Sequence, residues 1–362
     1  MQHQAWHACW LGAAALLLTA CGGGGDSPAA TTPPPSSACS RATLAQTLYQ
    51  QAAAVSTDTD FSLLVERPDG ARLSYARGSS SPVTVYESAS TSKWVSATII
   101  LRLVDRGLLS LDDTPAKHLS DWPLPATHPL SAMTLRQLLS FTSGLTDEPL
   151  CQNLPNQEFA SCVLSGVALN ANNGNAPGRS FHYNSLHLQL AGLMAMRASN
   201  VSQWSSVFNQ FRAETGLFAT GRYDLPSLNN PRLAGGMHWT GQEYLDFLRA
   251  LQQGQLLSAA SQAQMFSNQR GSATVGYSPA LAGFGVDWPY GLGNWQECAT
   301  VGCSATRYSS PGAYGAYPVW DKGQGYIAML ARQGDLGSFV KGKTLMDSLT
   351  PAINAWATCA NP

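Results

Sequence analysis

The sequence predicts a mixed α/β (α+β) fold, in which an antiparallel sheet flanked by helices is built from both ends of the chain. A mainly helical subdomain is expected between the two parts. Strand-like segments occur at residues 61–78 and again after about residue 280, and helical patterns fill the region between them. The domain is expected at 39–362, with an α/β part at about 39–85 and 275–362 and a helical part at about 86–274.

The elements follow in order along the chain. A helix after Cys39 begins with Ser40 as its N-cap, and two strands at 61–70 and 71–78 meet at a Pro-Asp-Gly turn. The residue pattern predicts helices at 91–106, 133–144, 187–199 and 241–254. Short strands are expected within 282–293, 305–321 and 323–333, and a last amphipathic helix at about 339–357.

Composition excludes several kinds of partner. Charged residues make up 12% of the 362 residues, against roughly 25% in an average globular protein, and the formal net charge is −1. No run of Lys or Arg occurs, so nucleic acid and acidic membrane surfaces are poor partners for this chain. A small-molecule substrate is the expected partner.

The first residues have the pattern of an export signal. The stretch WLGAAALLLTAC is apolar, ends in small residues, and is too short to span a bilayer permanently. Its end, Leu18-Thr19-Ala20-Cys21, resembles the bacterial lipobox, which implies a signal peptide at 1–20 and a lipidated Cys21. The alternative is a generic signal peptide with an incidental cysteine. No Lys or Arg precedes Arg41, so the position of the true start stays open.

Residues 21–38 are rich in Gly, Pro, Ser and Thr and predict a flexible linker. The expected location is therefore the periplasmic side of a bacterial membrane, the outer one by preference, with a lipid anchor.

Six cysteines remain within the domain, an even number that suggests disulfides in an exported chain. Their spacing favours three pairs: Cys39–Cys359, Cys151–Cys162 and Cys298–Cys303. A metal site is the competing interpretation, but the sequence has no CxxC pair and no Cys/His cluster.

A serine and a lysine stand three residues apart at the start of an apolar helix, in ESASTSKWVSATIILRLVDRG. Residues at this spacing share a helix face, so Ser90 and Lys93 can touch. Burial lowers the pKa of a lysine, which can then act as the base that a nucleophilic serine needs. The motif is weak alone: Ser338-Phe339-Val340-Lys341 is a second match, interpreted as an ordinary helix start.

Further segments, in order, make the pattern specific. SASTSKWVSATIILRLVDRGLLSLDDTPAKHL, MTLRQLLSFTSGL, APGRSFHYNS, LAGGMHWTGQEYLDFLRALQQGQLLS and SSPGAYGAYPVWDKGQGYIAML cover about residues 87–330. Together they resemble the serine β-lactamase/penicillin-binding superfamily, in particular the branch of class C β-lactamases, D-aminopeptidases and family VIII esterases. The resemblance implies the β-lactamase/transpeptidase-like fold.

The same resemblance implies roles for individual residues. Ser90 would be the nucleophile, while Lys93 and Tyr183 would share proton transfer. The ammonium of Lys93 is expected to favour ionisation of the Tyr183 phenol. The backbone N–H groups of Ser90 and Ala313 would form the oxyanion hole.

Two departures concern substrate binding. The usual Tyr-x-Asn is Tyr183-Asn184-Ser185 here, so Ser185 would replace an amide. Where relatives carry Lys-Thr-Gly or His-x-Gly, this chain has Ser310-Pro311-Gly312, with Ser310 and Gly312 as expected substrate-binding positions. Since proline has no N–H, the strand is expected to be an edge at Pro311.

The sequence therefore predicts an exported serine hydrolase, without cofactor or metal, that acts on small neutral esters or amides. The first alternative is a β-lactamase or D-Ala-D-Ala carboxypeptidase, and the second is a silent lipoprotein that binds peptidoglycan fragments. Loss of the cation at Ser310 disfavours carboxylate-bearing β-lactams, and nearby aromatic residues suggest an apolar cleft wall.

Overall fold

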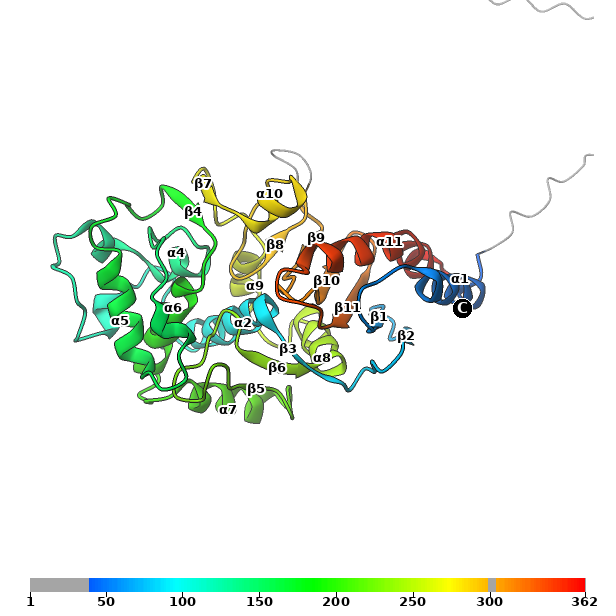
Figure 1. Cartoon of the computed structure of the whole chain (residues 1–362), viewed down its shortest axis with the longest axis horizontal. Coiled ribbons are helices and arrows are strands. Elements are labelled where there is room, and N and C mark those ends of the chain that lie inside the picture. Colours follow the sequence, from blue (N-terminus) through cyan, green and yellow to red (C-terminus); the bar gives the residue numbers. More distant parts are fainter. Residues whose placement is uncertain (1–38, 299–303, 362) are drawn as a thin grey trace, which may run out of the picture. The chain divides into compact units, whose positions relative to one another are not determined.

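The computed structural model describes residues 39–298 and 304–361, and the residues from Cys39 on form one compact unit (Figure 1). The predicted signal peptide, the lipidated Cys21 and the linker lie outside the described residues. So does the pairing of Cys298 with Cys303, because Cys303 is not among them. No helix of the described residues is long and apolar enough to cross a membrane.

Both ends of the domain contribute to one antiparallel sheet, as predicted. Within the described residues its strand order is β2-β1-β11-β10-β9-β8. The strands are β1 (Phe61–Glu66), β2 (Arg72–Ala76), β8 (Trp295–Gln296), β9 (Arg307–Ser309), β10 (Tyr317–Asp321) and β11 (Tyr326–Arg332). β1 pairs with β11 along its whole length, from Phe61 opposite Arg332 to Glu66 opposite Ile327. The pairing places the first and last strands of the domain side by side inside the sheet, with β2 at the edge next to β1.

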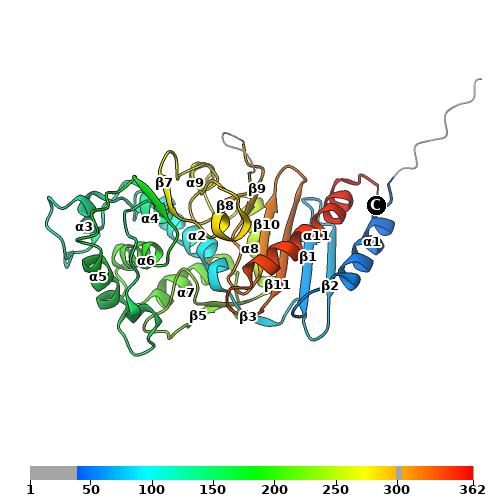
Figure 2. The same cartoon turned by 45° about the horizontal axis from the view of Figure 1, so that its top comes forward.

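Helices cover both faces of this sheet. α1 (Arg41–Ala54) and α11 (Phe339–Thr358) lie together on one face, whereas α8 (Gly241–Gln252) contacts β1 and β11 from the other (Figure 2). Side chains of a strand alternate between faces. Accordingly Leu63 packs in the core beneath α1 and α11, and Leu64 packs in the core of the helical region.

The helical region contains most of the remaining elements. Its α-helices are α2 (Ser92–Asp105), α3 (Pro115–His118), α4 (Leu135–Leu139), α5 (Phe159–Leu169), α6 (Leu186–Ala198), α7 (Trp204–Thr215) and α9 (Ala259–Met265), and α10 (Pro279–Phe284) follows. Short 3-10 helices are η1 (Ala89–Thr91), η2 (Pro129–Ala132) and η3 (Leu150–Asn153). Two small sheets join β3 (Val85–Glu87), β6 (Met237–Thr240) and β5 (Arg222–Tyr223), and β4 (Ser180–His182) with β7 (Thr274–Tyr277).

α2 is enclosed by other helices because it is apolar on nearly every side. Every residue from Ser92 to Leu101 is buried, and the helix contacts α6, α7 and α9. Figure 1 shows it in the centre of the helical region, with α6 beside it. The start of α2, which carries Lys93, is therefore held on all sides.

Several local predictions are confirmed. Ser40 caps α1 by accepting from the Thr43 N–H, and the strands β1 and β2 pair across the predicted turn. One prediction is wrong: within 282–293 the chain forms the end of α10 and a loop instead of a strand. Ser278 caps α10 and Pro279 follows at its first position, a start signal that outweighed the strand pattern.

Two of the predicted disulfides are present in the described residues. Cys39–Cys359 joins the segment just before α1 to the residue after α11, with 5.8 Å between the Cα atoms. Cys151–Cys162 joins η3 to α5.

Candidate active site

Ser90 lies in a tight turn at the entrance to α2. The residue before it, Ala89, has a φ of 45°, in the left-handed region that residues other than glycine seldom adopt. Two hydrogen bonds stabilise the turn. The Ser88 N–H donates to the Met237 carbonyl, and the Thr91 hydroxyl donates to the Ser88 carbonyl. The backbone thus presents a partly exposed Ser90 in a constrained conformation.

Lys93 lies one turn further along and reaches back to the serine. Its Nζ is 2.8 Å from Ser90 Oγ and donates to the Ala234 carbonyl at 2.9 Å. The side chain is buried, and burial lowers the pKa of Lys93 to about 7; Glu148 acts in the opposite direction and Arg232 in the same direction. Close to neutral pH, a substantial fraction of Lys93 is therefore uncharged and able to accept a proton.

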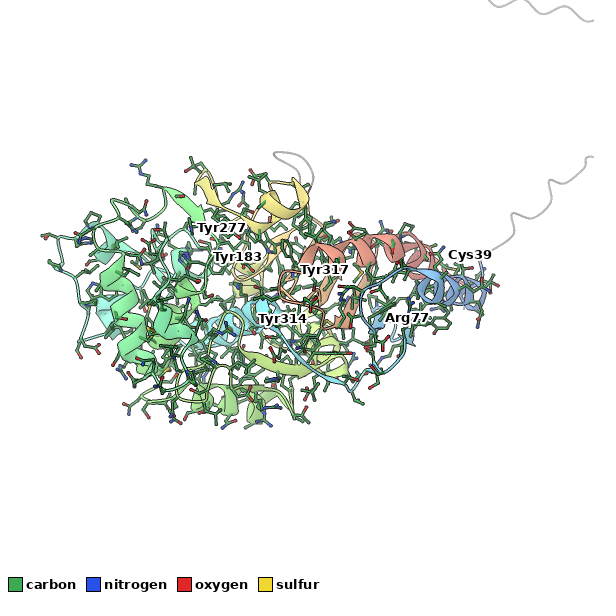
Figure 3. The ribbon with its side chains drawn as sticks, viewed as in Figure 1. Cys39, Arg77, Tyr183, Tyr277, Tyr314 and Tyr317 are labelled. Carbon is green, nitrogen blue, oxygen red and sulfur yellow. A yellow bond between two sulfur atoms is a disulfide. The ribbon has the colours of Figure 1, made fainter. Side chains whose placement is uncertain are left out.

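Tyr183 completes the group from the end of β4. Its backbone N–H donates to the Tyr277 carbonyl, and its ring stacks on Trp295 with 5.2 Å between centroids. Lys93 Nζ lies 4.6 Å from the centre of the phenol ring. Figure 3 shows Tyr183 and Tyr277 close together on this side of the molecule.

The expected ionisation of Tyr183 is wrong in direction. Burial raises the pKa of the phenol well above its ordinary value, although hydrogen bonding with Ser90 and Trp295 opposes the rise. The ammonium does not compensate, because Lys93 itself loses charge near pH 7. Tyr183 is therefore protonated near neutral pH, and of the two groups Lys93 is the one better able to accept a proton.

The predicted oxyanion hole would consist of the backbone N–H groups of Ser90 and Ala313. Among the hydrogen bonds of the described residues, neither the Ser90 N–H nor the Ala313 N–H donates to a backbone carbonyl. Ala313 is held through its carbonyl, which accepts from the Gly337 N–H at 3.0 Å. Both residues line the same pocket, so the two N–H groups border the space where an acyl oxygen would lie.

Ser310 has a different contact from the one expected. Its hydroxyl donates to the Ser90 carbonyl at 2.9 Å, and the residue is only 2% exposed. It therefore links the loop 310–316 to the turn that carries Ser90. Gly312 has a matching role, since a Cβ there would lie 2.6 Å from the Ser88 carbonyl oxygen.

Pro311 also differs from expectation, since it lies in the loop beyond β9 and not on an edge strand. β9 pairs with both β8 and β10, and it ends at Ser309, before the proline can interrupt the ladder.

Ser185 is partly exposed and caps no N–H of α6 with its side chain. Its backbone N–H donates to the Glu148 carboxylate. The Asn184 side chain is buried and donates to the Leu145 carbonyl at 2.9 Å. No contact therefore replaces the missing amide directly.

A pocket of about 250 Å³ adjoins these groups. Its lining consists of Ser90, Tyr183, Tyr277, Pro279, Ala280, Phe284, Trp295, Pro311, Ala313, Leu336, Gly337 and Phe339. None of these side chains carries a formal charge at pH 7. α10 and the start of α11 supply part of the wall, which sequence reasoning missed because Tyr277, Phe284, Leu336 and Phe339 belong to no recognised motif.

Most aromatic residues suggested as cleft wall belong to the core. The aromatic residues near the expected site are Trp288, Tyr290, Trp295, Tyr308, Tyr314, Tyr317 and Trp320. Among these Trp295 lines the pocket, while Trp288, Tyr290, Tyr308, Tyr317 and Trp320 are buried elsewhere. Arg307 is not part of the pocket lining and pairs with Glu297 and Asp321.

The other candidate constellations are structural. Lys341 of the second Ser-x-x-Lys match is 60% exposed and pairs with Asp58, and Ser338 precedes α11. Asp113 receives hydrogen bonds from Ser110, Lys117 and His118. Within 39–298 and 304–361 no group of His, Cys, Asp and Glu could hold a metal ion.

The chain is similar in sequence to a known protein family and to a curated protein. The family model "Beta-lactamase" matches residues 64–348. "Protein flp" of Staphylococcus aureus (strain N315) is 29% identical over 136 residues, which are 36% of this chain and 26% of that protein. The chain therefore matches about a quarter of the length of this curated relative.

Two solved structures resemble most of the chain. A candidate beta-lactamase from Bacteroides dorei DSM 17855 has 28% identity and a TM-score of 0.68, covering 82% of this chain and 93% of the other. EstCE1, described as a hydrolase with promiscuous acyltransferase activity, has 17% identity and a TM-score of 0.67, covering 85% and 98%. At that identity EstCE1 supports the fold alone.

Proposed function

Because the chain belongs to the Beta-lactamase family, we propose that it is a serine hydrolase that works through an acyl-enzyme on Ser90. One observation carries the proposal. Lys93, with its pKa lowered to about 7, lies 2.8 Å from the hydroxyl of a partly exposed serine. This pair adjoins an uncharged pocket bordered by two free backbone N–H groups.

Acylation begins with proton transfer. Neutral Lys93 accepts the Ser90 proton as Oγ attacks the acyl carbon, and the oxyanion accepts hydrogen bonds from the Ser90 and Ala313 N–H groups. When the intermediate collapses, protonated Tyr183 gives its proton to the leaving group and regains one from Lys93. Water then attacks the acyl-enzyme, with the same groups acting in reverse.

The preferred substrates are small neutral esters or amides. Penicillins and D-Ala-D-Ala peptides carry a carboxylate, and the pocket lining offers it no cation. Ser310 provides no substitute, since its hydroxyl is bonded to the Ser90 carbonyl. A missing charge-assisted hydrogen bond costs about 1.5–3 kcal/mol, or roughly 10- to 150-fold in binding.

The test combines labelling with a substrate panel. A fluorophosphonate probe should label the wild type and Ser338→Ala but not Ser90→Ala. kcat/KM should be higher for p-nitrophenyl acetate or butyrate than for any penicillin or cephalosporin. An unlabelled, inactive wild type would favour the silent peptidoglycan-binding alternative, and faster cephalosporin turnover would favour a β-lactamase.

We also propose that the protein is exported and anchored by a lipid at Cys21. Support comes from the apolar leader that ends in Leu18-Thr19-Ala20-Cys21. The disulfides Cys39–Cys359 and Cys151–Cys162 agree with an oxidising compartment. Cys21→Ala should move the protein from the membrane fraction to the soluble fraction; unchanged membrane association would contradict the anchor.

A further inference from the structure

The second partner of Lys93 is a backbone carbonyl whose own position has to be maintained. The Ala234 oxygen accepts from Nζ at 2.9 Å and so holds the amine against Ser90. Ala234 belongs to the segment 230–236 that leads into β6, not to a regular helix or strand. Backbone hydrogen bonds hold Arg232 and Gly236, since the Arg232 N–H donates to the Leu225 carbonyl and the Gly236 N–H to the Arg232 carbonyl. Leu233 is held by side chains, and Ser96 Oγ donates to its carbonyl at 2.7 Å.

The side-chain amide of Gln189, on α6, holds this segment from one side. Its Oε1 accepts from the Leu233 N–H at 2.6 Å and its Nε2 donates to the Pro231 carbonyl at 3.1 Å. Gln189 is 2% exposed, so water is a poor replacement for either bond. Gly192, three residues on, leaves room for Leu233 to lie directly against α6, because a Cβ there would be 1.9 Å from the Leu233 Cδ1.

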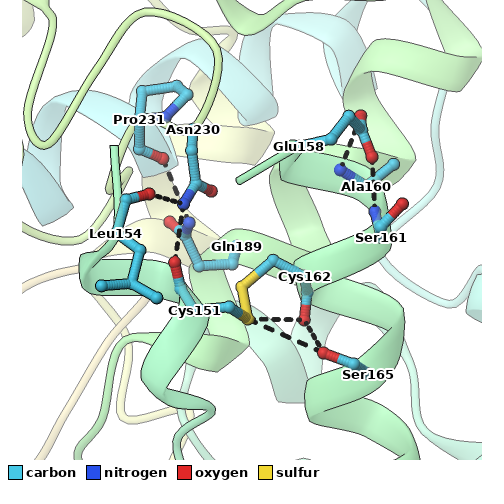
Figure 4. Close-up of a disulfide and its surroundings, with 10 residues drawn as sticks. All are labelled: Cys151, Leu154, Glu158, Ala160, Ser161, Cys162, Ser165, Gln189, Asn230 and Pro231. Carbon is cyan, nitrogen blue, oxygen red and sulfur yellow. Dashed lines mark hydrogen bonds between the residues drawn. A yellow bond between two sulfur atoms is a disulfide. The ribbon is translucent and has the colours of Figure 1, made fainter. Parts of the chain in front are cut away.

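A second anchor lies at the beginning of the segment. Asn230 is fully buried and its Nδ2 donates to the carbonyls of Cys151 and Leu154, at 2.8 and 3.0 Å. Both carbonyls belong to the turn around η3, which the Cys151–Cys162 disulfide joins to α5. Figure 4 shows this arrangement, with Gln189 and Pro231 next to Asn230.

We propose that Gln189 is a positioning residue for Lys93, with Asn230 and the Cys151–Cys162 disulfide as its outer support. The proposal rests on the proposed function, since it concerns the base of that reaction. Gln189 fixes Pro231 and Leu233, and these fix the next carbonyl, which holds Nζ at Ser90. If the segment moves, Nζ loses one of its two partners and water can reach the amine.

The two consequences can be separated by pH. Burial is the largest cause of the low pKa of Lys93, so admitting water raises that pKa towards 10.5. After a partial rise less of the base is neutral at pH 7, whereas at pH 9, which is still above the raised pKa, most of it is neutral. In a variant that circular dichroism shows to be folded at both pH values, a loss of stability alone leaves the pH 9 to pH 7 ratio of activities unchanged.

The experiment measures kcat/KM for p-nitrophenyl butyrate at pH 7 and pH 9. Gln189→Leu removes both bonds while keeping the volume, and it should lose about tenfold or more at pH 7 and clearly less at pH 9. Gln262→Leu is the control. This partly buried amide on α9 donates to the Leu251 carbonyl at 3.3 Å and makes no hydrogen bond to the segment 230–236. Its loss should leave the pH 9 to pH 7 ratio of kcat/KM unchanged.

If circular dichroism shows that Gln189→Leu does not fold, two other variants test the same positioning role. Asn230→Ala and the double change Cys151→Ser/Cys162→Ser should each lower activity at pH 7 more than at pH 9. Folded variants with an unchanged pH 9 to pH 7 ratio would overturn the positioning role. If the wild type itself neither labels at Ser90 nor hydrolyses esters, the proposed function fails instead.

Discussion

Replacing Lys93 with methionine should make the protein more stable while abolishing its activity. Lys93 is buried with a pKa of about 7, against 10.5 for the free side chain. In the unfolded chain the amine binds a proton throughout this interval, whereas in the folded protein it does not. Unfolding is therefore accompanied by proton uptake, and stability rises with pH between about 7 and 10.5.

The magnitude follows from the shift. A difference of about 3.5 pKa units corresponds to about 5 kcal/mol of destabilisation at and below pH 7. Methionine removes this term but leaves the Ala234 carbonyl without its partner, at a cost of about 1–3 kcal/mol. We expect Lys93→Met to gain about 2–4 kcal/mol at pH 6. The gain should shrink by about 3 kcal/mol at pH 9, because the wild type recovers stability there.

Urea unfolding followed by tryptophan fluorescence measures both values, with wild type and variant at pH 6 and pH 9. Lys341→Met is the matched control, because that lysine is 60% exposed and should give no comparable gain at either pH. A Lys93→Met variant that is less stable than wild type at pH 6, or whose advantage does not change with pH, would refute the buried neutral lysine.

Three other outcomes are expected. Ser90→Ala should reduce ester turnover by at least about 10³-fold, whereas Ser338→Ala should stay near wild type. The opposite pattern would assign the nucleophile to Ser338 instead of Ser90. In the wild type, kcat/KM should rise about tenfold from pH 6 to pH 8, as Lys93 becomes neutral, and a profile flat over this range would exclude Lys93 as the base. Removing the Cys39–Cys359 bond, which spans 320 residues, should cost up to about 5 kcal/mol in urea unfolding, and no change in the midpoint would contradict this.

Local patterns were sufficient for the elements that depend on neighbours in sequence. The cap at Ser40, the paired strands after it and the helix at 339–357 were all predicted, because capping and amphipathic periodicity act over a few residues. α10 was missed because its six residues are too few to show a period, and its start signal was the better guide.

The same distinction applies to the site. The sequence by itself determined that Ser90 and Lys93 share one face of a buried helix start, because three-residue spacing and an apolar run decide this locally. Only the tertiary structure decided which groups face substrate. Ser310 turned towards the Ser90 carbonyl, and Phe339 reached the pocket from the far end of the chain. Both depend on how distant segments pack, as does the contact of the Gln189 amide with the Leu233 N–H, next to the Ala234 carbonyl that accepts from Lys93. Such contacts follow from filling a common interior, and no sequence period records them.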